Sequence, residues 1–218
     1  MEKKTIVNEL YNYLEDVCGY NKPILLTQIY DAFPSIKQGT IREYIRRFIA
    51  NEKLIKIKNG VYGLPDPGRV LKKPAINFDE AINKKYIVDN EGLTIGYRSG
   101  FYIANVLRLT TQTPSILVIY SNAVSRKKRI IKIKNSKIII NQSRVIVSNE
   151  NYKLLQVLDI LNNFDKFSEF PLESTKNIFA KHLNGLELTK NEIEKIVDAY
   201  PKDAQINFYK LGVINEIT

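Results

Sequence analysis

The sequence is poor in the residues that build common metal and phosphate sites. It has one cysteine, Cys18, and one histidine, His182, which excludes an intrachain disulfide and zinc sites of four cysteines or of two cysteines and two histidines. Its ten glycines form neither a GxxxxGKS/T nor a GxGxxG pattern, so no nucleotide-phosphate loop is indicated. Cys18 closes an apolar helical pattern, which predicts a buried, small hydrophobic side chain.

Long apolar stretches are also missing. No segment approaches the roughly 18 to 20 apolar residues that a membrane-spanning helix needs. The N-terminal stretch MEKKTIVNELYNYLEDV carries acidic residues early and lacks the apolar core of a signal peptide. We therefore expect a soluble, cytoplasmic protein without a membrane partner.

Candidate catalytic residues do not cluster along the chain. A lone histidine near a predicted helix end, as His182 is, more often caps the helix or lies partly exposed than it catalyses, and no serine or cysteine triad is recognisable. Asp79, Glu80 and Asp159 are scattered, whereas a metal-dependent nuclease needs carboxylates close together. We expect no enzyme, cofactor or metal; a nucleic-acid enzyme would require carboxylates and lysines that only the fold brings together.

Positive charge is what the sequence has in excess. In 218 residues, 33 lysines and arginines oppose 23 aspartates and glutamates, which gives a formal net charge of +10. Because this charge is clustered, it favours a polyanionic partner, either nucleic acid or an acidic protein, over a role in solubility alone. Hydrophobic residues make up 44%, enough for real cores, and the length fits two modest domains.

Two helices are predicted at the start of the chain. Apolar residues recur at helical spacing over residues 5–18 and again over 27–33, with Thr27 as the N-cap of the second helix. Pro34 ends that helix, because the residue before a proline is pushed out of the helical region. The short apolar run 24–26 is either a small strand or a lead-in to the helix.

A third helix and a hairpin follow. Ser35 with Gln38 and Thr40 with Glu43 each form a capping-box pattern, and we favour Thr40 as the helix start because Gly39 would be costly inside a helix. The predicted buried stripe comprises Ile41, Ile45 and Phe48. The alternating stretch 54–58, the turn Asn59-Gly60 and the return 61–64 then predict a hairpin. Together these elements predict a winged helix-turn-helix DNA-binding domain over residues 1–66.

The third helix and the wing supply the candidate DNA contacts. A helix fits the major groove, where outward side chains near its N-terminal end reach base edges. The candidates on and before this helix are Lys37, Gln38, Thr40, Arg42, Tyr44, Arg46 and Arg47. On the wing, phosphate or minor-groove contacts are expected from Lys56, Lys58 and Asn59. Two alternatives are a solvated basic face on an ordinary helical domain and a winged helix that binds protein.

The rest of the chain predicts a mixed α+β domain over residues 77–218, after a proline-containing linker at about residues 65–76. The expected helices cover residues 79–87, 96–109, 151–161, 173–183, 188–199 and 203–211. The helix from 188 carries a capping box of Thr189 and Glu192. The expected strands cover residues 116–120, 129–134, 137–140 and 144–147.

A second basic surface lies in this domain. It comprises Arg126, Lys127, Lys128, Arg129, Lys132 and Lys134, and the basic run continues with Lys137 and Arg144. No acidic residue occurs between Tyr120 and Asn149. Three roles stay open: a second DNA contact, a docking surface for an acidic partner, or an edge hairpin that lysines guard against strand pairing.

Several stretches together resemble a known family. The wing sequence KNGVYGLP, the proline-containing linker and GLTIGYRSGFYIANVLRLTTQTP with a strand after it resemble the AbiEi-type antitoxins of type IV toxin–antitoxin systems. The resemblance is best over the wing and Gly92–Pro114. It implies an N-terminal winged helix-turn-helix, with Thr40–Arg47 as recognition helix and Lys56–Tyr62 as wing, joined to an antitoxin domain. It carries over no toxin-neutralising residue.

The resemblance also implies the function and the partners. Such a protein is a transcriptional repressor that binds double-stranded DNA in its own promoter region, and it neutralises a cognate toxin protein of the nucleotidyltransferase type. A single winged domain covers a short half-site, so two copies on a repeated site are a reasonable arrangement, and the oligomeric state stays open. The alternative is a winged-helix interaction module that binds an acidic protein without sequence-specific DNA recognition.

Overall fold

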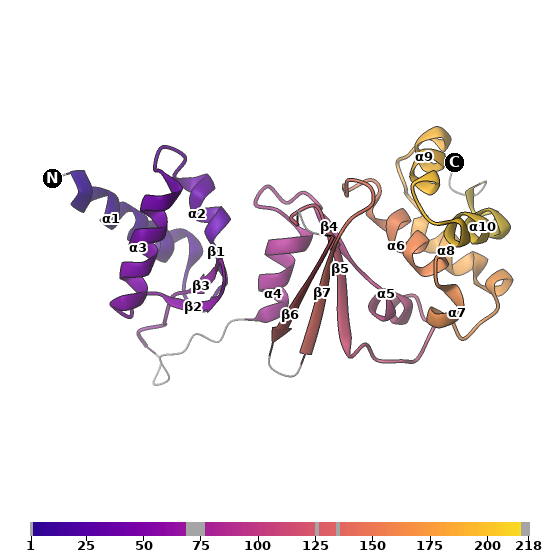
Figure 1. Cartoon of the computed structure of the whole chain (residues 1–218), viewed down its shortest axis with the longest axis horizontal. Coiled ribbons are helices and arrows are strands. Elements are labelled where there is room, and N and C mark those ends of the chain that lie inside the picture. The colour runs from indigo at the N-terminus through magenta and orange to yellow at the C-terminus, as the bar shows by residue number, and fades with distance from the viewer. Residues whose placement is uncertain (1, 69–76, 125–126, 134–135, 215–218) are drawn as a thin grey trace. The chain divides into compact units, whose positions relative to one another are not determined.

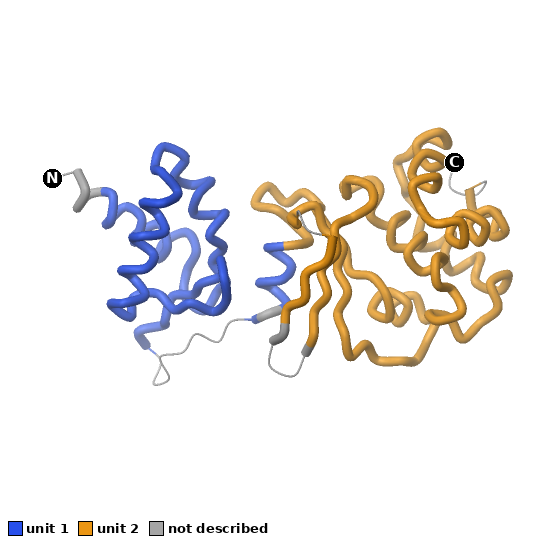
Figure 2. Tube along the Cα trace, in the orientation of Figure 1, with its two compact units in different colours: residues 1–85 blue, residues 86–218 orange. Residues whose placement is uncertain are grey.

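The computed structural model of the chain describes residues 2–68, 77–124, 127–133 and 136–214. They form two compact units, unit 1 over residues 1–85 and unit 2 over residues 86–218 (Figure 2). Both contain helices and a β-sheet, so the expected mixed α+β class is what the structure has. Within the described residues, no helix combines the length and apolar character that a membrane span requires.

Unit 1 combines helices with a small antiparallel sheet (Figure 1). The elements in chain order are α1 (Glu2–Tyr13), the π-helical turn η1 (Leu14–Cys18), β1 (Ile24–Leu25), α2 (Leu26–Ala32), α3 (Gln38–Ala50), β2 (Ile55–Lys58) and β3 (Val61–Gly63). The three strands are ordered β1-β3-β2, with both pairs antiparallel. The run 24–26 thus supplies a short strand and the first residue of α2.

The core of unit 1 follows the predicted apolar stripes. Ile41, Ile45 and Phe48 of α3 are buried, as expected, against Leu10 of α1 and Ile29 of α2. Burying one such side chain contributes about 1.5–3 kcal/mol, so this cluster holds the helices on the sheet. Cys18 lies in the same core as a buried free thiol, which confirms its predicted role.

Two predicted helix starts are wrong by one or two residues. Helix α3 begins at Gln38 with Lys37 as N-cap and no side-chain cap bond, so Thr40 and Gly39 both lie in its first turn. First-turn N–H groups need no intrahelical acceptor, and a Cβ at Gly39 would meet no atom within 4 Å. Helix α2 begins at Leu26 instead of Thr27, because the Leu26 amide donates to the Gly60 carbonyl across the sheet, at 3.0 Å.

The predicted hairpin of unit 1 is confirmed. Strands β2 and β3 pair around the turn Asn59-Gly60, where Gly60 has a φ of 74° that other residues rarely adopt. Helix α4 (Phe78–Ile82) and the π-helical turn η2 (Asn83–Ile87) match the helix expected over 79–87. Residues 69–76 of the predicted linker lie outside the described residues.

Unit 2 is a four-stranded mixed sheet with helices. Its strands are β4 (Gly96–Ser99), β5 (Ile116–Ser121), β6 (Lys128–Ile133) and β7 (Ser136–Gln142). The order is β4-β5-β7-β6, in which β5 and β7 are parallel and the outer pairs are antiparallel. The helices are α5 (Phe101–Val106), α6 (Tyr152–Leu161), α7 (Phe164–Phe167), the 3-10 turn η3 (Leu172–Thr175), α8 (Lys176–Leu183), α9 (Lys190–Asp198) and α10 (Lys202–Leu211).

Helix α6 is the centre of unit 2. Every residue from Leu154 to Leu161 is buried, because the helix contacts β4, α8 and α10 on different sides. A mostly apolar helix, here with the buried polar residues Gln156 and Asp159, is typical of such a central position. The capping box predicted for Thr189 and Glu192 is present at the start of α9.

Two predictions for unit 2 are wrong. The stretch 96–109, predicted as one helix, is the strand β4 followed by α5. Gly96 pairs with Ser121 at a point where a Cβ would collide with the Tyr86 carbonyl. Gly100, at a φ of 66°, separates the strand from the helix. The stretch 144–147 is not a strand. There the side chain of Asn122 accepts from the Val147 amide at 3.0 Å and donates to its carbonyl at 2.9 Å, so a side chain takes the place of a neighbouring strand.

Candidate nucleic-acid interface

Helix α3 has one buried and one exposed face. The predicted contact residues with exposed side chains on or before it are Lys37, Gln38, Thr40, Arg42, Arg46 and Arg47. The prediction that the Tyr44 side chain points outward is wrong, because this side chain is only 6% exposed and packs in the core with Ile41 and Phe48. The reason is spacing: Tyr44 is three residues after Ile41 and four before Phe48, which puts it on the buried stripe.

Arg42 is held in place by helix α2. Its Nε donates to the Tyr30 hydroxyl at 2.6 Å, and its guanidinium carbon lies 5.7 Å from the centre of the Tyr30 ring. The planar guanidinium has five N–H donors, and Nε–H supplies only one of them. The contact with Tyr30 therefore orients Arg42 while leaving it the forked geometry that pairs with guanine.

Glu43 joins the two other arginines of this face. Its carboxylate accepts from Arg46 Nη1 at 2.7 Å and from Arg47 Nε at 3.2 Å. The side chains of Arg46 and Arg47 are 77% and 65% exposed, and such exposed ion pairs contribute only about 0–1 kcal/mol. A phosphate can therefore compete with Glu43 for either arginine.

The capping-box pattern predicts Glu43 as the partner of Thr40, whereas in the structure its carboxylate pairs with Arg46 and Arg47. The available signal was its spacing of three and four residues from Arg46 and Arg47, which brings side chains together on a helix. Glu43 thus belongs to the candidate interface, both as an acceptor that orients two cations and as a negative charge within a basic face.

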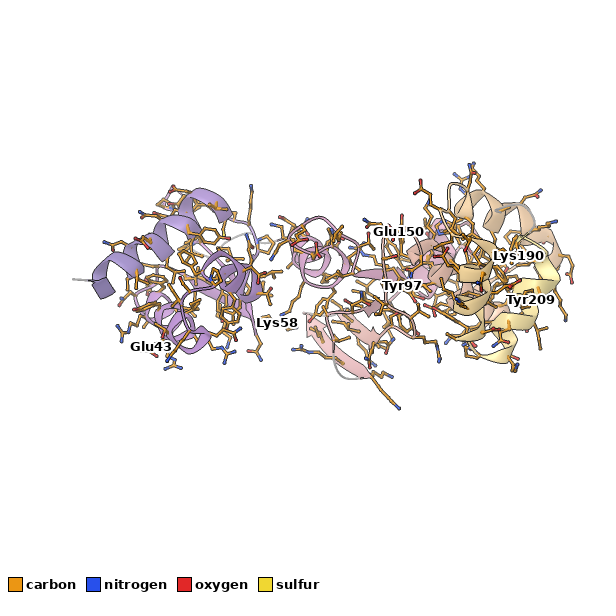
Figure 3. The ribbon with its side chains drawn as sticks, turned by 90° about the horizontal axis from the view of Figure 1, so that it is seen from above. Glu43, Lys58, Tyr97, Glu150, Lys190 and Tyr209 are labelled. Carbon is orange, nitrogen blue, oxygen red and sulfur yellow. The ribbon has the colours of Figure 1, made fainter. Side chains whose placement is uncertain are left out.

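The hairpin β2–β3 presents the other predicted contacts of unit 1. Lys56 and Asn59 are exposed and Lys58 is half-buried. The pairing register shifts between Lys56 and Lys58, as a bulge does, and a bulge bends and twists a strand locally. Glu43 of α3 and Lys58 of β2 are both labelled in Figure 3.

The second basic surface lies in unit 2. Lys127, Lys128 and Arg129 are exposed at the start of β6, and Lys132 is part of that strand. Arg126 and Lys134 lie outside the described residues. Strand β6 is an edge of the four-stranded sheet, so the exposed lysines fit both a binding surface and a guarded edge.

Two ionisable side chains in the interior of unit 2, Asp159 and His182, have hydrogen-bond partners. The buried Asp159 carboxylate accepts from Ser99 Oγ at 2.9 Å, and burial raises its pKa to about 7. His182 Nε2 lies 3.0 Å from Gln156 Oε1, and burial lowers the pKa of the imidazole to about 4. Among the described residues, no three histidine, cysteine, aspartate or glutamate side chains gather as a metal site.

Comparison with known proteins adds no relative. The sequence matches no model of a protein family, and it finds no match among curated proteins.

Proposed function

We propose that unit 1 is a winged helix-turn-helix that binds double-stranded DNA. In this proposal α2 and α3 form the helix-turn-helix pair, α3 enters the major groove and the hairpin β2–β3 is the wing. The order α1-β1-α2-α3-β2-β3 and the three-stranded antiparallel sheet support the assignment, because they put a hairpin directly after the helix that carries the basic face.

The observation that carries the proposal is the exposed face of α3. Arg42, Arg46 and Arg47 lie opposite the buried stripe of the same helix and are oriented by Tyr30 and Glu43. Arginine pairs bidentately with guanine and glutamine with adenine, so we assign base contacts to Gln38, Arg42 and Arg46. Phosphate contacts, which position a protein without reading sequence, fall to Lys37, Arg47, Lys56 and Lys58.

The biological role follows from the resemblance to the AbiEi-type antitoxins. We propose a transcriptional repressor that binds its own promoter region and acts as the antitoxin of a type IV toxin–antitoxin system, with unit 2 as the antitoxin domain. The target is a cognate nucleotidyltransferase-type toxin. One copy of unit 1 covers only a short half-site, so two copies on a repeated site would together contact a longer stretch of DNA.

Fluorescence anisotropy tests DNA recognition directly. The full-length protein is titrated into the duplex upstream of its own gene and into a scrambled duplex, from low to physiological salt. We expect at least roughly a hundredfold preference for the upstream duplex, about 2.7 kcal/mol, which survives physiological salt. Weak binding that is equal on both duplexes and vanishes at physiological salt would contradict the proposal and leave an acidic protein as the partner of the positive charge.

A further inference from the structure

The strand register of unit 2 creates an apolar row with lysines on either side. Residues paired across neighbouring strands share one face of a sheet. Ile139 of β7 is paired with Val118 of β5 and with Ile130 of β6, so these three side chains form one row across the strands. Asn141 and Lys137 lie two residues from Ile139 along β7, in opposite directions. Asn141 is paired with Lys128 of β6, and Lys137 is paired with Ile116 of β5.

The helices of unit 2 cover only part of this face. On the β4 side, Ser99 is bonded to Asp159 of α6, and a Cβ at Gly100 would lie 3.6 Å from Val118 and 3.9 Å from Phe167 of α7. The helical layer therefore reaches as far as Val118. In Figure 1, β6 is the strand farthest from helices α5 to α10.

The described residues leave the outer part of the same face exposed. Ile130 is 51% exposed and Ile116 37% exposed, Lys128 is exposed, and Ile139 is half-buried. An isoleucine that is half exposed in the middle of a regular strand loses the free energy that burial would give it, about 25 cal/mol for each Å² of apolar area. A partner that covers this row would recover that free energy.

The charge around the row has one sign. The sequence has no aspartate or glutamate between Tyr120 and Asn149, a stretch that contains β6 and β7. Lys128 and Lys137 lie on the two sides of the apolar row, with no acidic residue on either strand to neutralise them. The complementary surface is therefore apolar in its centre and acidic along both margins.

We propose that this surface, the basic sheet face of Lys128, Ile130, Lys137 and Ile139, docks an amphipathic acidic helix of a partner protein. Neighbouring strands are about 4.8 Å apart, so the three-residue row spans about 10 Å, close to the rise of about 10.5 Å between residues i and i+7 of a helix. The lysine rows lie about 7 Å to either side, within reach of acidic residues that flank the apolar stripe of a helix about 10–12 Å wide.

The apolar row distinguishes this occupant from the two alternatives for the second basic surface. Lysines alone are enough to guard an edge strand or to contact DNA phosphates, and neither role needs an exposed isoleucine between them. An acidic amphipathic helix uses the isoleucines and the lysines together. Because the surface lies on unit 2, the proposal holds whether or not unit 1 binds DNA.

A designed peptide tests the proposal on the full-length protein. The probe is a fluorescein-labelled helical peptide of about five turns, roughly 18 residues, with a leucine stripe flanked by glutamates, and its control has the same composition in scrambled order. By anisotropy at physiological salt, we expect the patterned peptide to bind at least about tenfold more tightly than the scrambled one. Ile130→Ser and Lys128→Glu should each lower the affinity at least about tenfold.

Lys190→Glu is the matched control, because it makes the same charge change at an exposed lysine of α9 and should leave peptide binding unchanged. Equal affinity for the two peptides, no binding, or equal losses in Lys128→Glu and Lys190→Glu would overturn the proposal. Two other occupants of the basic sheet face would give different results, and either result would also overturn the proposal. A second copy would give dimers in sedimentation equilibrium that Ile130→Ser abolishes, and DNA would give a duplex affinity that falls with Lys128→Glu while peptide binding does not.

Discussion

The two units place their ionisable groups in opposite ways. In unit 1, Arg46 and Arg47 pair with Glu43 on an exposed helix face, whereas in unit 2 Asp159 is buried and accepts from the Ser99 hydroxyl. Exposed charges are screened by salt, and buried charges are disfavoured by desolvation. The difference predicts that salt governs the DNA binding proposed for unit 1 and that pH governs the stability of unit 2.

The largest expected effect is on unit 2 at Asp159. Because burial raises the pKa of this carboxyl from 3.8 to about 7, the folded state keeps a proton that the unfolded state releases, so stability falls as the pH rises from about 4 to about 7. The full loss is on the order of 4 kcal/mol. The substitution Asp159→Asn should remove this pH-dependent loss. The variant should therefore be more stable than the wild type at pH 8 but not at pH 4.

Hydrogen exchange of peptides from α6, read by mass spectrometry, measures this effect in unit 2 without interference from unit 1. Protection in the wild type should decrease from pH 4 to pH 7 after correction for the intrinsic exchange rate, and protection in Asp159→Asn should not. An identical pH profile for both proteins would show that the carboxyl does not titrate in this range.

Next in size is the effect of the arginines of unit 1. Arg42→Ala or Arg46→Ala should weaken binding to the upstream duplex by about 1–3 kcal/mol if the residue contacts a base. Affinity for scrambled DNA should fall much less. The measurement is anisotropy on both duplexes at one fixed salt concentration, and equal losses on the two would refute base recognition by that arginine.

An effect smaller than that of Asp159, and of the opposite sign, is expected at His182, whose imidazole is only partly buried. Since burial lowers the pKa of the imidazole from 6.5 to about 4, the unfolded state takes up a proton first, and stability falls as the pH decreases from 6.5 towards 4. His182→Gln should remove this acid-side loss. Exchange of α8 peptides between pH 4 and pH 6.5 tests it, and a loss of protection that persists unchanged in the variant would assign it to other groups.

The smallest effect is expected at Glu43. Glu43→Gln removes the negative charge between Arg46 and Arg47, so binding to every duplex should tighten by less than about 1 kcal/mol and should depend more steeply on salt. Glu9→Gln, at an exposed glutamate of α1, is the control for net charge. If both variants tighten binding equally, the effect belongs to overall charge rather than to the α3 face.

Local patterns predicted the elements of unit 1 well. The helical stripe of Ile41, Ile45 and Phe48 and the turn Asn59-Gly60 depend on neighbours in sequence, and the structure confirms both. The same spacing also puts Tyr44 in the core, since it lies three residues after Ile41 and four before Phe48. The DNA contacts themselves stay a prediction.

Long-range contacts decided what the sequence could not show. Strand β4 exists because Gly96 pairs with Ser121, and 144–147 is irregular because Asn122 satisfies the backbone of Val147. Neither partner is near in sequence. The same holds for the basic sheet face, because only the register of β5, β6 and β7 puts three apolar side chains in a row between lysines.

In the DNA-binding role proposed for α3, the carboxylate of Glu43 affects how fast the protein finds its site. It stays attached to the helix and so competes with every phosphate for Arg46 and Arg47. Such competition weakens non-specific contacts, which are mostly electrostatic, and thereby shortens the time spent on wrong sequences. The base contact proposed for Arg42 escapes this competition, because Arg42 Nε donates to Tyr30 and not to Glu43. Glu43 therefore shortens the time spent on random DNA more than the time spent at the right site, which speeds the search.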